Sequence, residues 1–455
     1  MKSSVSLATA CLVALCFCQT GFGQAGVSSM SSTALRSGIT LKSKEIRVEE
    51  LINFHRHQIP LPGWEHRIGI DTRANKMPDG KTAFQIGLAT HRDVVEEHRV
   101  PLNLVLVIDR SGSMNGDRIR KVKNSLGKLI GKLTDRDLVS VVTYSTEASI
   151  CLETTTGGDA DAVASAISSI EAGGSTNLNA GLMKGYEVAL RNLDDDRANR
   201  VILLTDGIAN VGVTAEKQIA SASKEYNEKG IGLSTIGLGA SFNRSLLREL
   251  ADAGRGAIHF IADANDIQKV FVDEFDSLLS PAAMDVSLTI RVPDGNPMPK
   301  IFGYEPQKSR NEYRIPMGNM SYGATQVVVG KFGARVPPQI EVELNYYDSV
   351  TKKKVTDGKT VRLAEFDTED AVLQKNYTIA KLAQAVWRSA KLVESGSFEK
   401  ASKRLEVVIE YAQSNYDATS DPDVDRVCKI ATRQHQQVER FCESNTSRKV
   451  HGFRN

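Results

Sequence analysis

The sequence is poor in cysteine, in long apolar runs and in net charge, and each shortage excludes a class of protein. Six cysteines stand in 455 residues, which is too sparse a set for a disulfide framework. Apart from a short N-terminal segment, no stretch approaches the roughly 20 apolar residues that a membrane-spanning helix requires. The formal net charge of +2 argues for neither nucleic acid nor an acidic partner. These exclusions leave the class of globular proteins. The composition, 41% hydrophobic and 25% charged residues, is typical of that class.

Short motifs of the common enzyme classes are also missing. The chain contains no G-x-S-x-G, no H-E-x-x-H and no Walker A sequence. The Gly-Leu-Gly near residue 237 lacks the rest of a dinucleotide-binding fingerprint. We therefore expect this protein not to be an enzyme.

The N-terminal segment has the layout of a secretory signal peptide. Lys2 precedes the apolar stretch VSLATACLVALCFC, and the small-residue stretch TGFGQAG follows it. Cleavage after Gly23 predicts an exported chain that is periplasmic, displayed on the cell surface or secreted. A lipid anchor at Cys16 or Cys18 is the alternative, but each of them follows a bulky residue, where lipid-modification sites want a small one.

The three remaining cysteines are expected to be free thiols. They are Cys151, Cys428 and Cys442. The last two lie in one predicted helix, where a rise of about 1.5 Å per residue would separate them by about 21 Å, too far for a disulfide.

Strands and helices alternate between residues 102 and 280. The stretches LNLVLVID, LVSVVTYS, RVILLTD, IGLSTIGLG and GAIHFIA indicate strands, and the first is nearly all apolar, as a parallel strand covered on both faces should be. Amphipathic helical stretches lie between them, and most end at or just before a glycine. This alternation predicts an α/β fold with a doubly wound, mostly parallel sheet.

The sequence on either side of this block predicts a second, β-rich domain. HRIGIDTR and TAFQIGLATHRD before it, and DVSLTIRV, TQVVVGKF and IEVELNYYDS after it, alternate apolar and polar residues as half-exposed strands do. We expect the α/β domain to be inserted into this β-rich domain, with a strand from about 64–95 pairing with one from 284–347. The predicted division is a signal peptide at 1–23, the first β-rich part at 24–100, the α/β domain at 101–281, the second β-rich part at 282–366 and a helical region at 367–455.

Three loops at predicted strand ends are rich in oxygen ligands. The first is VIDRSGSMNG with Asp109, Ser111 and Ser113, the second is GGSTNLNAGL with Thr176, and the third is LLTDGIANVG with Asp206. Ligands of open parallel sheets bind beyond the carboxyl ends of the strands, so we expect these loops to meet. A set of two carboxylates and three hydroxyls suits Mg²⁺ first, Mn²⁺ or Ca²⁺ next, and does not suit zinc.

These three loops resemble the metal-ion-dependent adhesion site of the von Willebrand factor type A domain. DRSGSM, GGSTNLNAGL and LLTDG stand in the order and strand-end context of that Rossmann-like family, and the resemblance covers roughly 102–280. The segment IRVEELINF near 47–54 and the stretch IFGYEP further resemble a group of exported bacterial von Willebrand A proteins.

The resemblance implies roles for the five residues and a kind of partner. Ser111, Ser113 and Thr176 would be direct ligands, and Asp109 and Asp206 would act mainly through water or hydrogen bonds to the ligands. Neutral hydroxyl ligands would leave the ion most of its charge, so an open coordination position can accept an Asp or Glu of a partner protein. Two other interpretations remain open: a hydrolase that uses the ion as a Lewis acid, and a structural envelope scaffold in which the ion only stabilises the fold.

Two histidines form a second, weaker candidate metal site. His55 and His57 could share one face of a strand and bind a metal ion together. Without a third ligand nearby in the sequence, we expect them instead to be surface histidines.

Overall fold

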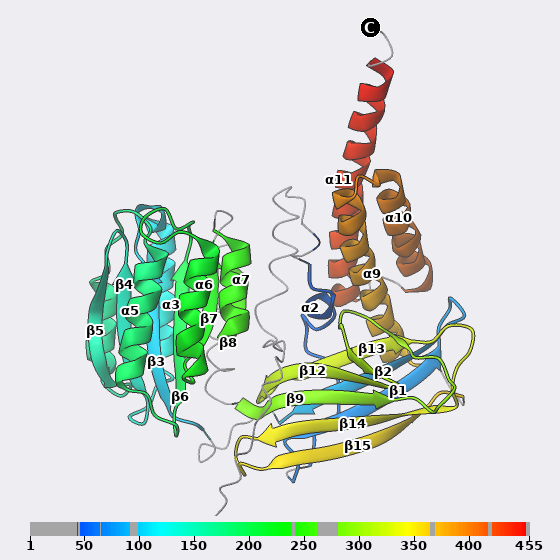
Figure 1. The fold of residues 1–455 in the computed structure, drawn as a ribbon, viewed down its shortest axis with the longest axis horizontal. Helices are drawn as coiled ribbons and strands as arrows, with labels where there is room; N and C mark the ends of the chain where they lie inside the picture. Colours follow the sequence, from blue (N-terminus) through cyan, green and yellow to red (C-terminus); the bar gives the residue numbers. More distant parts are fainter. Residues whose placement is uncertain are drawn as a thin grey trace, which may run out of the picture.

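The computed structural model describes residue 43 and residues 46–63, 65–91, 99–238, 242–261, 281–364, 369–416 and 421–451. The signal peptide and the alternative lipid anchor fall outside the described residues. Figure 1 shows an α/β domain at one side, two β-sheets at the other, and a group of helices standing on those sheets. No helix among the described residues is long and apolar enough to cross a membrane.

The α/β domain is built on one six-stranded sheet, with strand order β5-β4-β3-β6-β7-β8. Its strands are β3 (Leu102–Asp109), β4 (Leu138–Tyr144), β5 (Ala148–Thr156), β6 (Ala198–Thr205), β7 (Gly232–Leu238) and β8 (Arg255–Ile261). Every neighbouring pair is parallel except β4 and β5. The predicted doubly wound, mostly parallel sheet is confirmed, and β5 is an antiparallel edge strand that the sequence patterns did not indicate.

Helices cover both faces of this sheet. They are α3 (Asp117–Ile130), α4 (Ala160–Ser168), α5 (Leu178–Arg191), α6 (Glu216–Glu228) and α7 (Arg244–Ala253). Alternate residues of β3 point into different cores, with Leu106 packed in the core that includes α3 and α4, and Val107 in the core that includes α5, α6 and α7. Both faces of β3 are therefore buried, which explains why its sequence is almost entirely apolar.

Two antiparallel sheets form a β-sandwich beside this domain. Sheet A has the order β1-β2-β13-β10, and sheet C has the order β11-β12-β9-β14-β15. The bounds are β1 (Ile68–Lys76), β2 (Thr82–Thr90), β9 (Pro281–Arg291), β10 (Lys300–Ile301), β11 (Gln307–Ser309), β12 (Glu312–Ser321), β13 (Thr325–Lys331), β14 (Gln339–Asp348) and β15 (Lys354–Arg362). Strand β2 pairs with β13, so strands from before and after the α/β domain share one sheet, as expected from the sequence. A third apolar core, with Ile86 and Leu288 among its members, fills the space between the sheets.

Four helices lie on the outer side of sheet A: α2 (Val48–Ile52), α9 (Ala371–Glu394), α10 (Phe398–Asn415) and α11 (Pro422–His451). Helix α9 contacts β1, β2 and β13, and α10 and α11 pack against α9. Ile52, Tyr377 and Val427 of these helices share a core with Val327 of β13. The chain turns between α9 and α10 at Gly396, whose φ of 73° favours glycine. In Figure 1, α11 runs on past the ends of α9 and α10. The predicted helical C-terminal region is confirmed, and Cys151, Cys428 and Cys442 are free, as expected.

Helix α2 contacts helix α7 of the α/β domain through ion pairs. Arg47 Nη2 lies 3.0 Å from Asp252 Oδ2, and Arg248 Nη1 lies 3.9 Å from Glu50 Oε1. Glu50 is buried, and this burial raises its pKa from 4.5 to about 7, against the opposing effect of Arg248. The contact between α2 and α7 therefore contains a carboxyl group whose ionised form is destabilised by burial.

We expect the Glu50→Gln variant to remove a pH dependence of stability. Because the folded-state pKa of Glu50 is raised, the stability that its neutral form contributes is complete below about pH 4.5 and is lost as the pH rises through about 7. The melting temperature of the wild type should therefore fall relative to that of Glu50→Gln between about pH 5 and about pH 8. The Glu399→Gln variant, at an exposed position, is the control. If the melting temperatures of Glu50→Gln and wild type changed equally with pH across this range, the raised pKa of Glu50 would be contradicted.

Candidate metal centre

Backbone hydrogen bonds join the three oxygen-rich loops at one edge of the α/β sheet. The first loop bonds the second twice: Gly112 N donates to Gly174 O at 2.9 Å, and Gly173 N donates to Arg110 O at 2.7 Å. The second loop bonds the third, because Asn210 N donates to Thr176 O at 3.0 Å. The loops follow β3, β5 with α4, and β6, so residues far apart in the chain meet at the carboxyl ends of the central strands.

Asp109 lies at the base of this corner and is fully buried. Its Oδ1 accepts a hydrogen bond from Ser111 N at 2.8 Å, and its Oδ2 accepts one from Thr205 Oγ1 at 2.8 Å and one from Tyr144 OH at 3.3 Å. Burial raises the pKa of Asp109, and the bonds from Ser111 and Thr205 oppose that rise. Both carboxylate oxygens are thus engaged by protein donors, which suits a residue that holds the serine loop in place.

A chain of side-chain oxygens leads from the buried base toward the surface. The Oγ atoms of Ser111 and Ser113 share a hydrogen bond at 3.1 Å, and Ser113 Oγ donates to Asp206 Oδ1 at 2.6 Å. Ser111 and Asp206 are each 1% exposed, whereas Ser113 is exposed. The corner therefore opens to solvent at Ser113.

Thr176 lies at the same corner. A Cβ atom placed on Gly207 would be 3.5 Å from Thr176 Oγ1 and 3.8 Å from Ser113 Oγ, so both hydroxyls flank that glycine. Thr176 is held there by its backbone N–H, which donates to Asn210 Oδ1 at 2.8 Å. The structure thus brings all five sequence-predicted residues together.

The chemistry of this oxygen set fits a hard divalent cation. Its members are two carboxylates and three hydroxyls, with no nitrogen or sulfur ligand among them. No cluster of three or more His, Cys, Asp or Glu side chains that could hold a metal ion occurs in the described part of the chain. A metal centre at this corner would therefore depend on the hydroxyl groups of Ser111, Ser113 and Thr176.

The sequence patterns missed three side chains that support the corner. Thr205 and Tyr144 donate to Asp109, as described above, and Arg118 of α3 contacts Asp206. Arg118 Nη1 lies 2.6 Å from Asp206 Oδ2 and donates to Ser113 O at 3.1 Å. In the sequence, the positive charge nearest to the motif residues is Arg110, which lies inside the motif. Arg118 instead reaches the corner from the first turn of the following helix.

The prediction that His55 and His57 are surface histidines is wrong. His57 is 5% exposed, the side chain of His55 is 11% exposed, and their ring centroids lie 4.3 Å apart. Burial lowers the pKa of His55 to about 4 and that of His57 well below its usual value, so both rings are neutral at pH 7. The segment that carries them is covered by the C-terminal helices, and His55 Nε2 lies 3.7 Å from Asp423 Oδ2 of α11.

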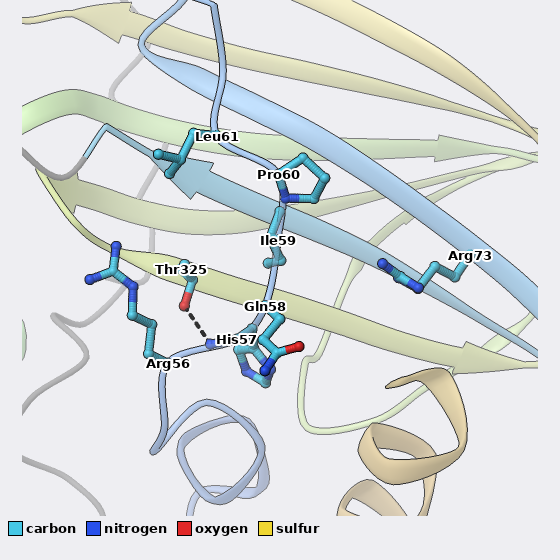
Figure 2. A pocket seen from close by; sticks show the side chains of 8 residues that line it. All are labelled: Arg56, His57, Gln58, Ile59, Pro60, Leu61, Arg73 and Thr325. Carbon is cyan, nitrogen blue, oxygen red and sulfur yellow. Dashed lines mark hydrogen bonds between the residues drawn. The ribbon is translucent and has the colours of Figure 1, made fainter. Parts of the chain in front are cut away.

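His57 also lines a pocket of about 410 Å³ over sheet A, which Figure 2 shows. The other lining residues are Arg56, Gln58, Ile59, Pro60, Leu61, Arg73 and Thr325. Arg73 is held by Asp71 at 2.8 Å and Asp370 at 3.2 Å, and His57 N donates to Thr325 Oγ1 at 2.8 Å. The lining offers one neutral histidine and no carboxylate, so it does not suit a second metal ion.

Comparisons with known proteins agree with the fold. Over 312 residues the chain is 31% identical to the uncharacterized protein YfbK of Escherichia coli (strain K12), which covers 65% of this chain and 53% of that protein. It is 26% identical over 284 residues to the inter-alpha-trypsin inhibitor heavy chain H4 of Homo sapiens, covering 61% of this chain and 28% of that protein. The chain therefore spans about half the length of the first of these relatives and less of the second.

A solved structure shows the same architecture. The von Willebrand factor type A structure from Catenulispora acidiphila superposes with a TM-score of 0.52 at 16% identity, covering 77% of this chain and 87% of that chain. At that identity the likeness concerns the fold alone. The family model of the von Willebrand factor type A domain matches residues 103–273, which carry all three loops of the corner. Residues 103–273 of this chain therefore match the von Willebrand factor type A family model and have its fold.

Proposed function

We propose that this protein is a metal-dependent protein-binding module. Asp109, Ser111, Ser113, Thr176 and Asp206 would hold a divalent cation, Mg²⁺ first and Mn²⁺ or Ca²⁺ next, that binds an Asp or Glu of a partner protein. The observation that carries the proposal is the convergence of three hydroxyls and two buried carboxylates on one solvent-open corner. A von Willebrand factor type A domain supplies the scaffold.

The geometry of this corner favours reversible binding of a partner's carboxylate over cleavage of a bond. Hydroxyl ligands are neutral, so the ion would keep most of its charge for an incoming carboxylate. Asp109 already accepts three hydrogen bonds and is suited to orient the serine loop. The charged group that contacts Asp206 is the guanidinium of Arg118, which cannot act as a general base at neutral pH. A hydrolase would need such a base within reach of its substrate.

Affinity capture from the native organism tests this proposal. We expect a partner to bind the immobilised protein in Mg²⁺ and to be released by EDTA. Turnover of a hydrolysable substrate would favour the hydrolase. A melting temperature that rises with Mg²⁺, together with no partner under any condition, would favour the scaffold.

Arg118→Gln should tighten metal binding. The guanidinium of Arg118 contacts Asp206 Oδ2 and so competes with any cation for that carboxylate. Two opposite charges at such a distance attract each other by about 1 kcal/mol in bulk water and about 4 kcal/mol near a protein surface. The Arg118 side chain is 43% exposed, so we expect the low end of that range, about tenfold tighter Mg²⁺ binding by calorimetry.

The matched control for this variant lies on the same helix. Arg120 pairs with the exposed Asp117 at 2.6 Å, so Arg120→Gln removes the same charge without touching the corner. It should leave Mg²⁺ affinity nearly unchanged. Unchanged or weaker affinity in Arg118→Gln would contradict competition between the guanidinium and the ion.

We also propose that the chain is exported and acts in the periplasm, on the cell surface or outside the cell. The proposal rests on the N-terminal sequence from Lys2 to Gly23. The mature protein should begin near Gln24, and N-terminal sequencing of the native protein is the test. Recovery of Met1 on the native protein would count against export.

A further inference from the structure

The third loop of the corner carries a strongly exposed apolar side chain. Ile208 is 58% exposed, more than any other large apolar residue among those described, and Val213 in the same loop is 38% exposed. Single exposed apolar side chains are common on protein surfaces, so exposure alone assigns no role. The role of Ile208 follows instead from its position beside the candidate metal centre.

Ile208 adjoins the point where the oxygen ligands meet. It lies two residues after Asp206 and follows Gly207, whose position is flanked by the hydroxyls of Thr176 and Ser113. A side chain that reaches a cation at those hydroxyls would pass close to Gly207. In the partner, the residue next to that acidic side chain would then contact Ile208.

The loop is anchored on both sides of Ile208. Before it, Asp206 accepts a hydrogen bond from Ser113 at 2.6 Å. After it, Ala209 is buried, and Asn210 exchanges two hydrogen bonds with Thr176, at 2.8 and 3.0 Å. The outward position of Ile208 is therefore fixed by its neighbours, and a surface ordered in advance costs less entropy on binding.

We propose that the partner presents an apolar residue directly beside its acidic residue, and that Ile208 packs against it. This inference rests on the proposed metal-dependent function and names the partner's local chemistry. Val213 is a second exposed apolar side chain on the same loop. The cation would supply the contact to the carboxylate, and the loop would select among acidic segments by their apolar neighbour. Fixed polar groups beside an apolar surface are the usual composition of a selective binding site.

A peptide-display selection tests this directly. A random peptide library is panned on the full-length protein in Mg²⁺ and eluted with EDTA, in parallel for wild type, Ile208→Ser and Leu190→Ser. Leu190 is 37% exposed at the far end of α5 from the corner, so its replacement is a matched loss of apolar surface. Melting temperatures and Mg²⁺ titrations of all three proteins check that the fold and the metal centre are retained.

We expect wild type and Leu190→Ser to enrich peptides with an Asp or Glu beside an aliphatic or aromatic residue. Ile208→Ser should still enrich acidic peptides but lose the apolar neighbour, and should bind a synthesised wild-type selectant about five- to tenfold more weakly. The same apolar preference in Ile208→Ser would overturn this inference and leave the metal-dependent function standing. A wild type that yields no EDTA-eluted acidic peptides would overturn both.

Discussion

The Asp109→Ala variant should lose metal binding and partner binding together. Asp109 is fully buried and accepts hydrogen bonds from Ser111 N, Thr205 Oγ1 and Tyr144 OH. Its removal releases the serine loop and leaves Ser111 N without its acceptor, whereas Tyr144 OH and Thr205 Oγ1 also lie near Leu204 O and Gly207 O. Loss of a residue that orients metal ligands typically costs about 10- to 100-fold in affinity, and Asp109 holds the loop that supplies two of the three hydroxyls. We therefore expect a loss of at least about 100-fold in Mg²⁺ affinity.

Calorimetric titration of Mg²⁺ measures this loss, and two further variants make it interpretable. Asp109→Asn keeps an acceptor for Ser111 N and should fold normally while binding Mg²⁺ more weakly than wild type. Asp117→Ala removes an exposed carboxylate in the first turn of α3 and should bind Mg²⁺ as the wild type does. Wild-type Mg²⁺ affinity in a folded Asp109→Ala would show that the ion, if bound, sits elsewhere.

The Asp137→Ala variant should destabilise the domain more than any other single carboxylate change that we propose. Asp137 is fully buried, and its two oxygens accept hydrogen bonds from Arg99 at 3.1 and 2.6 Å, from Leu102 N at 2.9 Å and from Thr134 N at 2.8 Å. It thereby ties the chain entering β3 to the loop before β4. Removing one member of a buried ion pair leaves the other charge uncompensated and costs about 3–5 kcal/mol in the free energy of unfolding.

Denaturant unfolding measures the effect on Asp137→Ala, and Asp135→Ala is its control. Asp135 is exposed two residues away, so its loss should change the free energy of unfolding by at most about 0.5 kcal/mol. Replacing both partners, in Arg99→Met with Asp137→Leu, should restore part of the stability, because no lone charge then remains buried. A loss of stability in Asp137→Ala no larger than in Asp135→Ala would contradict this role for the ion pair.

The strands that carry the candidate metal centre were predictable because burial on both faces leaves a strong signal. β3 and β6 are apolar runs that end in an aspartate-bearing loop, and a parallel sheet follows from their alternation with helices. β5 and β15 were missed for the opposite reason. Both are edge strands whose residues, apart from Val361 of β15, are half-exposed or exposed, so their sequences show little apolar periodicity.

The supporting contacts could not be predicted, because they join distant residues through side-chain direction. Arg118 and Asp206 are 88 positions apart, and Thr205 reaches Asp109 across 96. A sequence pattern fixes which face of an element a residue occupies but not which side chain it meets on another element. The burial of His55 and His57 was not predicted for a related reason. The helices that cover them follow more than 300 positions later in the chain.

Water-proton relaxation with Mn²⁺ tests the central claim most directly, since it reports whether a bound ion keeps exchangeable positions. Mn²⁺ is titrated into the wild type, and then a short glutamate-containing peptide or its glutamine counterpart is added. The account predicts strong relaxation enhancement, absent in Asp109→Ala, that the glutamate peptide reduces and the glutamine peptide leaves unchanged. No enhancement, or an enhancement that both peptides leave unchanged, would contradict a metal centre that opens to a partner's carboxylate.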